Sequence, residues 1–122
     1  MKMLVVDDSS VIRNRIVQVS RHPDLPDLDV VGTARHGGEA LLLAREYLPD
    51  VVTMDLTMPN VDGVACIKGL MKISPDMRIL VISALGDRKT ALNAMSCGAH
   101  GFLHKPFTSE ELVEGLKELL KD

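Results

Sequence analysis

Four short apolar runs in the chain each end in a residue whose side chain could do chemistry. The residues at these ends are, in chain order, Asp7 with Asp8, Asp55, Ser83 and Lys105. Carboxylates, an alcohol and an ammonium make a set that can hold a divalent cation and stabilise a phosphoryl group. The set is spread over nearly the whole sequence, so it forms a site only if the fold gathers these ends.

Asp55 is the central residue of this set. It closes the apolar run 51–54, and the strand-breaking residues Pro59, Asn60 and Asp62 follow it. A buried parallel strand has this pattern, because apolar and β-branched residues fill the sheet and turn formers end it. An isolated aspartate here would be explained as a turn former or a helix cap. The polar residues that end the other strands favour a functional role instead.

The three acidic residues are candidate metal ligands. The carboxylates of Asp7, Asp8 and Asp55, if brought to about 4 Å, would repel by roughly 4 kcal/mol per pair at an effective dielectric of about 20. A divalent cation relieves this repulsion. Oxygen ligands, completed by waters and a backbone carbonyl such as that of Thr57, favour Mg²⁺ over zinc, with Mn²⁺ as a substitute.

One of these carboxylates is free to act as a nucleophile, and we assign that role to Asp55. Attack on a phosphoryl group needs an in-line approach and positive charge around its three equatorial oxygens. The Lys105 ammonium and the Ser83 hydroxyl, together with the cation, would supply that charge and hydrogen bonding. We therefore predict Asp55, Ser83 and Lys105 as catalytic residues. Asp55 should be the only phosphorylated residue, since we expect no base beside Ser83.

The chain between these residues alternates predicted strands and helices. Apolar residues three and four apart predict an inward face for each helix. The predicted strands cover residues 3–6, 30–34, 51–54, 79–82 and 102–104. The predicted helices run from Ser9 or Ser10 to about His22, from 37 to 48, from 64 to 73, from 88 to 97, and onward from a capping box at 108–111.

The inner faces of two helices differ in size. The helix at 37–48 is expected to bury Ala40, Leu41, Ala44, Tyr47 and Leu48. The helix at 88–97 is expected to bury mostly Ala91, Ala94 and Met95. Such a thin apolar face holds a helix weakly, so this second helix is predicted to be the element that moves.

Five strand-then-helix units fill the chain, which predicts one α/β domain with a parallel sheet and helices on both faces. In a parallel sheet all strands point the same way. The residues that end the strands therefore converge on one edge, where ligands bind in open sheets of this class. This convergence is the strongest functional signal in the sequence.

The overall composition limits the kinds of partner. The chain has 122 residues, 46% of them hydrophobic, and a formal net charge of −3, which suits one compact domain without a basic surface for nucleic acid. Cys66 and Cys97 form no C-x-x-C pair, and the four histidines have no zinc-ligand spacing. No segment approaches the roughly 18 apolar residues that span a bilayer. We predict a cytoplasmic protein with reduced thiols and no membrane insertion.

The sequence also resembles a known family, the receiver domains of two-component response regulators, and is most similar to their single-domain chemotaxis type (CheY-like). The resemblance covers essentially all of residues 1–122 as one receiver domain. It is carried by Asp7-Asp8, Met54-Asp55-Leu56-Thr57-Met58-Pro59, Asp62-Gly63, Ser83-Ala84 and Lys105-Pro106-Phe107. It implies a flavodoxin-like (βα)5 three-layer sandwich with a five-stranded parallel sheet of order 2-1-3-4-5, and a cis peptide between Lys105 and Pro106.

The resemblance further implies a phosphorylation-activated switch and not an enzyme that turns over a separate substrate. A sensor histidine kinase or a phosphotransfer protein would place a phosphoryl group on Asp55 with Mg²⁺. The surface of the fourth helix, fifth strand and fifth helix would then change and control binding of a downstream protein, with chemotaxis as one setting. A monomer is expected, with dimerisation through this same surface as the alternative.

The family's switch residues fall on Ser83 and Phe102. Chemotaxis members carry Tyr where Phe102 stands, and a bulky His104 precedes the lysine, so a direct role at the flagellar motor does not follow. Two other function classes are open. An aspartyl-phosphate phosphatase of haloacid dehalogenase type would need a second Asp where Thr57 stands. A receiver-like interaction module that is never phosphorylated would be expected to have lost the acidic pair, the acceptor or the lysine.

Overall fold

Five strands form one parallel sheet in the computed structural model of the chain, which describes residues 1–57, 63–84 and 86–121. The strands lie in the order β2-β1-β3-β4-β5, and each neighbouring pair is parallel. Their bounds are β1 Lys2–Val6, β2 Asp29–Ala34, β3 Val51–Asp55, β4 Arg78–Ala84 and β5 Gly101–Lys105. The predicted flavodoxin-like fold and its strand order are therefore confirmed.

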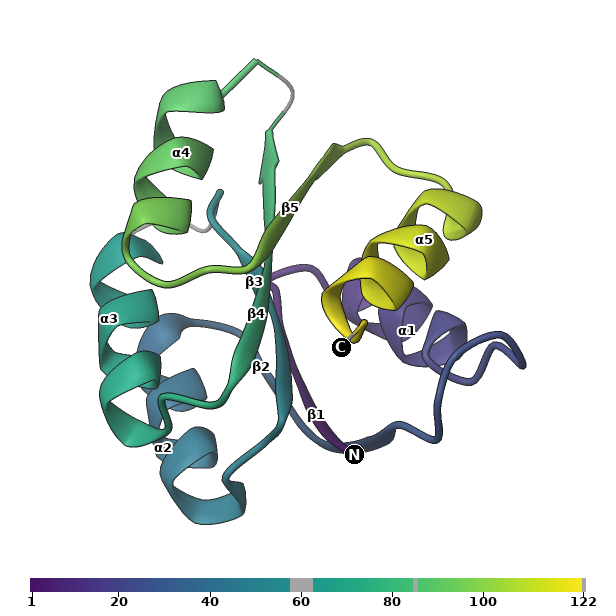
Figure 1. Cartoon of the computed structure of the whole chain (residues 1–122), viewed down its shortest axis with the longest axis horizontal. Coiled ribbons are helices and arrows are strands. Elements are labelled where there is room, and N and C mark those ends of the chain that lie inside the picture. Colours follow the sequence, from purple (N-terminus) through teal and green to yellow (C-terminus); the bar gives the residue numbers. More distant parts are fainter. Residues whose placement is uncertain (58–62, 85, 122) are drawn as a thin grey trace.

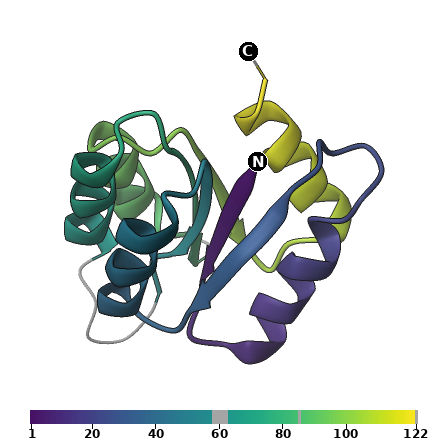
Figure 2. The same ribbon diagram turned by 90° about the horizontal axis from the view of Figure 1, so that it is seen from below.

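Helices cover both faces of this sheet. Their bounds are α1 Ser10–Val19, α2 Gly37–Tyr47, α3 Gly63–Ile73, α4 Arg88–Ser96 and α5 Ser109–Leu119. Helices α2, α3 and α4 lie on one face, and α1 and α5 lie on the other (Figure 1). The view from below separates the two groups clearly, with the strands between them (Figure 2). The molecule therefore has three layers, as right-handed crossovers between parallel strands require.

Each face of the sheet has its own apolar core. Val52 and Met54 pack on the side of α2, α3 and α4, and Val51 packs on the side of α1 and α5. All five residues of β3 are buried. A central parallel strand is covered on both faces, so it needs apolar side chains in both directions. This explains why β3 is mostly apolar, with Val51, Val52 and Met54, and why a buried aspartate at its end is exceptional.

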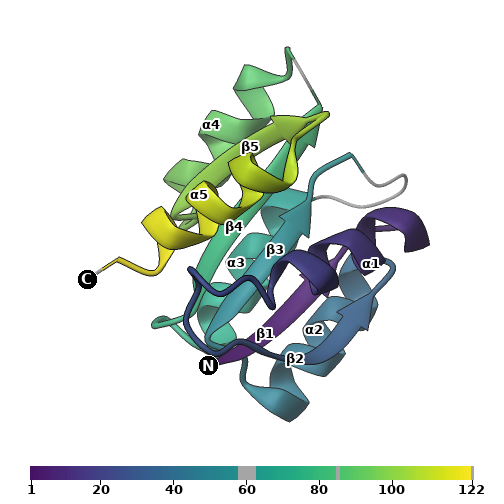
Figure 3. The same ribbon diagram turned by 90° about the vertical axis from the view of Figure 1, so that its right-hand side faces the viewer.

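The register of the ladder brings the strand ends together. Asp55 of β3 pairs with Ile82 of β4, and Ser83 pairs with His104 of β5. The carboxyl ends of β3, β4 and β5 therefore meet at one edge of the sheet, which Figure 3 shows with the strands side by side. The predicted convergence of the polar strand ends is confirmed.

Polar caps begin the two helices that flank the functional edge. The Ser9 hydroxyl accepts a hydrogen bond from the Ile12 amide at the start of α1. At α5 the predicted capping box is present, since Glu111 N donates to Thr108 Oγ1 and Thr108 N donates to the Glu111 carboxylate. Each cap satisfies amide groups that a helix N-terminus leaves unpaired, a contribution of about 1 kcal/mol.

Two predictions near helix ends are wrong: the end of α1 and part of the inner face of α2. Helix α1 ends at Val19 and not near His22, because the amides of Arg21 and His22 bond to carbonyls three residues back in tighter turns. At the end of α2, Tyr47 and Leu48 are 38% and 54% exposed, so they do not belong to its inner face. Leu48 adopts a left-handed conformation, with φ of 48°, which turns the chain away from the core.

The predicted cis peptide between Lys105 and Pro106 is present. The strand-breaking residues Pro59, Asn60 and Asp62 lie outside the described residues, as does Met58 of the family motif. Among the described residues, no helix is both long enough and apolar enough to cross a membrane.

Candidate functional site

An acidic cluster lies at the carboxyl ends of β1 and β3. One carboxylate oxygen from each of Asp7, Asp8 and Asp55 lies within 4.8 Å of the others. Asp7 and Asp55 are fully buried, whereas Asp8 is exposed. Two of the three carboxylates are therefore removed from water. The three predicted acidic ligands are thus brought together by the fold.

Lys105, at the end of β5, reaches across β4 into this cluster. Its Nζ lies 3.2 Å from Oδ2 of Asp7 and 3.2 Å from Oδ2 of Asp55. The ammonium is close enough for ion pairing, but neither Oδ2 accepts a well-aligned hydrogen bond among the described residues. Two buried carboxylates therefore share one cation. The net buried charge is negative, and both oxygens retain lone pairs for another ligand.

The pKa values of the cluster follow from this imbalance. Burial raises the pKa of Asp7 above its ordinary value, and the neighbouring Asp55 charge raises it further, against a backbone hydrogen bond and Lys105 that lower it. Burial alone would lower the pKa of Lys105, but the charges of Asp55 and Asp7 outweigh it and the pKa is raised. The ammonium is thus held firmly charged, while the site resists a second buried negative charge.

Hydrogen bonds from α1 and its cap hold Asp7 in place. Asp7 Oδ1 accepts from the Ser9 amide at 2.9 Å, and Arg13 Nη1 donates to the Asp7 carbonyl at 2.7 Å. Arg13 was not among the site residues predicted from the sequence. Its position one turn into α1, after the acidic pair, is the only signal that could have indicated this contact.

Thr57 holds the other aspartate. Its amide donates to Asp55 Oδ1 at 2.9 Å, and its hydroxyl donates to the same oxygen at 2.6 Å. Asp55 Oδ1 is therefore engaged while Oδ2 points toward Lys105. The predicted role of Thr57 concerns its backbone carbonyl as a metal ligand, which stays a prediction. The contact of its hydroxyl with Asp55 was not expected from the sequence.

Ser83 is fully buried one strand away from Asp55, and it has a partner that the sequence did not predict. Its Oγ lies 3.2 Å from His104 Nδ1, a hydrogen bond whose donor depends on the imidazole tautomer. The expectation that no base would lie beside Ser83 is therefore wrong. The cause is the ladder register, which pairs the two residues directly across β4 and β5.

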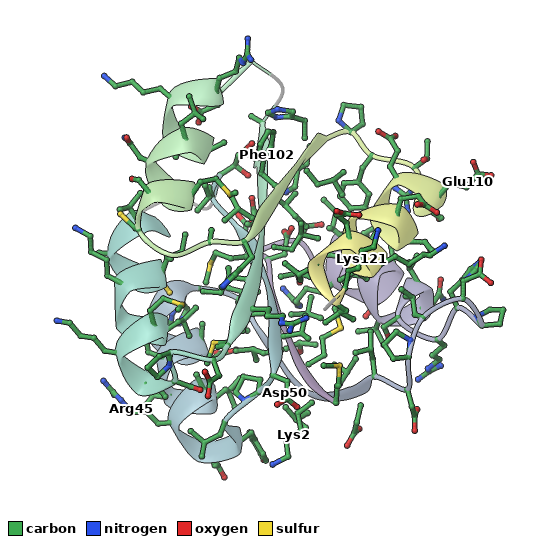
Figure 4. All side chains as sticks on the ribbon, viewed as in Figure 1. Lys2, Arg45, Asp50, Phe102, Glu110 and Lys121 are labelled. Carbon is green, nitrogen blue, oxygen red and sulfur yellow. The ribbon has the colours of Figure 1, made fainter. Side chains whose placement is uncertain are left out.

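Phe102, the second residue of β5, lies two residues before His104 on the same strand and is labelled in Figure 4. Its side chain is 47% exposed, so in this structure the ring is turned outward and not into the core. The rings of Phe102 and His104 meet edge to face, with centroids 5.3 Å apart. The imidazole therefore lies in contact with both Ser83 and Phe102.

A hollow of about 410 Å³ opens beside the acidic cluster. It is lined by Ile12, Arg15, Thr57, Ala84, Lys105, Pro106 and Phe107. The Arg15 guanidinium lies 5.0 Å above the centroid of the Phe107 ring, which places a second cation at its wall. An anionic molecule could reach the cluster from this side, between two positive side chains.

The family comparison agrees with this geometry. The family model described as the response regulator receiver domain matches residues 3–117. The chain belongs to this family. The interpretation of the sequence as a CheY-like receiver in phosphorylation-activated signalling is confirmed, and neither the phosphatase nor the unphosphorylated module is favoured.

Similar receivers occur both alone and within longer proteins. The chain is 37% identical to a chemotaxis protein CheY of Thermotoga maritima over 120 residues, which cover 98% of both chains. It is 42% identical to a protein-glutamate methylesterase/protein-glutamine glutaminase of Photobacterium profundum, covering 87% of this chain but 27% of that relative. The crystal structure of the response regulator domain of Thermotoga maritima CheB superposes with a TM-score of 0.81 at 34% identity, covering 98% of this chain and 92% of that one.

Proposed function

We propose that this receiver accepts a phosphoryl group on Asp55 from a histidine kinase or a phosphotransfer protein. The observation that supports the proposal most directly is the shared Lys105 ammonium, 3.2 Å from Oδ2 of both buried aspartates. Asp55 Oδ2 is the oxygen with no aligned hydrogen bond, so it is free to attack phosphorus. The new P–O bond forms as the donor's bond to phosphorus breaks, and the donor leaves with that electron pair.

We propose Mg²⁺ as the cation of this site, with Asp7, Asp8, Asp55 and the Thr57 carbonyl as protein ligands. The residues fit such an ion, because one oxygen of each carboxylate lies within 4.8 Å of the others, and Oδ2 of Asp7 and Oδ2 of Asp55 have no hydrogen bond among the described residues. When bound, the ion would neutralise charge that develops on the phosphoryl oxygens. Mn²⁺ satisfies the same oxygen ligands and is expected to substitute.

The residues around Asp55 have distinct tasks in this scheme. Lys105 lies close enough to bind a phosphoryl oxygen attached to Asp55 Oδ2. Thr57 holds Oδ1 through two hydrogen bonds and so fixes the direction of Oδ2. Ser83 would donate its hydroxyl to another phosphoryl oxygen. A donor would approach through the hollow between Lys105 and Arg15.

The output is a population shift at α4, β5 and α5. A phosphoryl group adds about −1.5 to −2 charge, which draws Ser83 and Lys105 toward Asp55. A ligand shifts an equilibrium only through its differential interaction with the two shapes, so the outward Phe102 shape and an inward one should coexist beforehand. Of the helices, α4 buries only Ala91 and Ala94 fully, so it yields most readily.

In this proposal residues 1–122 act as one receiver, in the cytoplasm, as a signalling switch that turns over no separate substrate. A downstream protein would bind the α4, β5 and α5 surface of a monomer, or the same surface would join two copies.

Phosphorylation with a small acyl phosphate tests the proposal. The protein is incubated with acetyl phosphate and Mg²⁺, and the covalent adduct is measured by intact mass. We expect one added phosphoryl group on the parent and none on Asp55→Asn. Asp50→Asn, at the other end of β3, serves as the matched control and should be labelled like the parent. An Asp55→Asn variant that is labelled equally well would place the phosphoryl group elsewhere, Ser83 beside His104 being the first alternative.

A further inference from the structure

The hydrogen bond between Ser83 and His104 joins the proposed phosphorylation site to the outer surface of β5. The two residues are direct partners in the parallel ladder, so their side chains lie on the same face of the sheet. The Ser83 side chain is fully buried and the His104 side chain is half-buried. Among the described residues, His104 Nδ1 is the partner that the Ser83 hydroxyl has in this structure.

The imidazole is also held from its other side. Its ring meets the Phe102 ring edge to face at 5.3 Å, with an interplanar angle of 67°. Phe102 lies on the outward side of β5, 47% exposed. Ser83, His104 and Phe102 therefore form a continuous row from a buried alcohol to an exposed aromatic ring. No residue of this row touches the acidic cluster in an interaction seen among the described residues.

The proposed function places a different demand on Ser83. A hydroxyl has a single O–H to donate, and the phosphoryl group on Asp55 needs it on the β3 side of β4. The bond to His104 keeps Oγ on the β5 side, whichever of the two groups is the donor. The two positions exclude each other, because one short side chain cannot reach both neighbouring strands.

We propose that His104 is a positioning residue that holds Ser83 away from the phosphorylation site until Asp55 is phosphorylated. It acts through Ser83 and touches no reacting atom. Phosphorylation breaks the Ser83 to His104 bond, and the freed imidazole then releases its edge-to-face contact with Phe102. This inference rests on the proposed function, since it assumes that Ser83 binds the phosphoryl group.

Removing the bond should favour the activated shape. His104→Val introduces a β-branched residue, which suits a strand, but it cannot hydrogen-bond to Ser83. We expect beryllium fluoride with Mg²⁺, the phosphoryl mimic, to bind this variant about threefold to tenfold more tightly than the parent, the effect of one neutral hydrogen bond lost from the competing state. Affinity is measured from amide signals during a titration. Equal affinities would overturn the proposal.

Two matched variants separate positioning from packing. His104→Asn can place an amide close to where Nδ1 lies, so it should bring the affinity back toward the parent value. In a Ser83→Ala background, His104→Val should change the affinity by less than twofold, because the bond is already absent. A tightening that persists without Ser83, or an Asn variant that binds as tightly as the Val variant, would contradict the proposed route.

A spectroscopic measurement tests the bond without any phosphoryl group. The nitrogen-15 shift of His104 Nδ1 should differ between the parent and Ser83→Ala, and adding the mimic to the parent should move it toward the Ser83→Ala value. If neither Ser83→Ala nor the mimic changes the Nδ1 shift, the proposal is wrong. Failure of the proposed function looks different: the parent would then take no phosphoryl group from acetyl phosphate, while the shift between the parent and Ser83→Ala would remain.

Discussion

The two ends of β3 each carry an aspartate, and the two carboxylates have opposite environments. Asp50 immediately precedes the strand and is exposed. Its Oδ2 accepts a hydrogen bond from the Lys2 amide at 2.8 Å, while its own amide and carbonyl pair with Lys2 and Arg78. Figure 4 shows Lys2 and Asp50 together at the lower end of the sheet, well below Phe102.

Asp55, only five residues later, is buried beside a second buried carboxylate. Its Oδ2 has an ammonium nearby but no aligned hydrogen bond. One carboxylate therefore ties neighbouring strands together, whereas the other is left incompletely satisfied. The role of an aspartate on β3 is therefore decided by the number of its partners relative to the number of charges, and not by residue type or by the strand that carries it.

The largest effect should come from removing the shared cation. Lys105→Met keeps the length of the side chain but leaves Asp7 and Asp55 buried without a counter-charge. We expect it to lower the free energy of unfolding by about 3 kcal/mol at neutral pH without metal, as for other broken buried ion pairs. Urea unfolding in the presence of a chelator measures this. Lys2→Met, at the exposed end, should change stability by only about 0.5 kcal/mol. Equal losses of unfolding free energy in Lys105→Met and Lys2→Met would contradict the proposed difference between the two ends of β3.

A divalent cation should have the next largest effect, and only at the Asp55 end. Mg²⁺ at about 100 times its dissociation constant should stabilise the protein by about 2.7 kcal/mol, because it binds the folded state alone. Asp8→Asn should remove this stabilisation, and it should raise metal-free stability by relieving crowding among the three carboxylates. Asp50→Asn should leave the metal effect intact. If millimolar Mg²⁺ does not change the melting temperature of the parent, the proposed metal site is wrong.

The smallest effect concerns pH. The folded pKa of Asp7 lies above its ordinary value of 3.8, because the group is buried. Between these two values the folded state binds more protons than the unfolded chain, so the contribution of Asp7 to stability falls as pH rises through this window. Asp7→Asn should therefore match the parent near pH 3 and be more stable by about 1 kcal/mol at pH 7, measured without metal. If the difference in unfolding free energy between Asp7→Asn and the parent becomes smaller toward neutral pH, then Lys105 stabilises the charged form of Asp7 by more than burial destabilises it.

The fold and the acidic cluster were predictable because their signals are local. Each strand is an apolar run with a polar end, and parallel pairing gathers those ends without further information. Asp7, Asp55 and Lys105 therefore meet as expected. The capping box at Thr108 and Glu111 is equally local, since a cap is defined within four residues.

The contacts that the sequence could not predict depend on register or on side-chain direction. Ser83 meets His104 only because β4 and β5 pair at that offset, and a shift by one residue would turn one of them to the other face. Arg13 finds the Asp7 carbonyl through its rotamer, which its type does not fix. Leu48 matches the helical spacing of an inner face, but the left-handed turn at the end of α2 overrides that spacing.

The position of β4 between β3 and β5 also determines how far a signal must travel from Asp55 to β5. Neighbouring strands lie about 4.8 Å apart, so β3 and β5 are separated by about 10 Å, with the buried strand β4 between them. The backbone of β5 therefore lies beyond hydrogen-bonding reach of Asp55. A change there must be carried by atoms in contact, and the side chains that bridge this width belong to Ser83, His104 and Lys105.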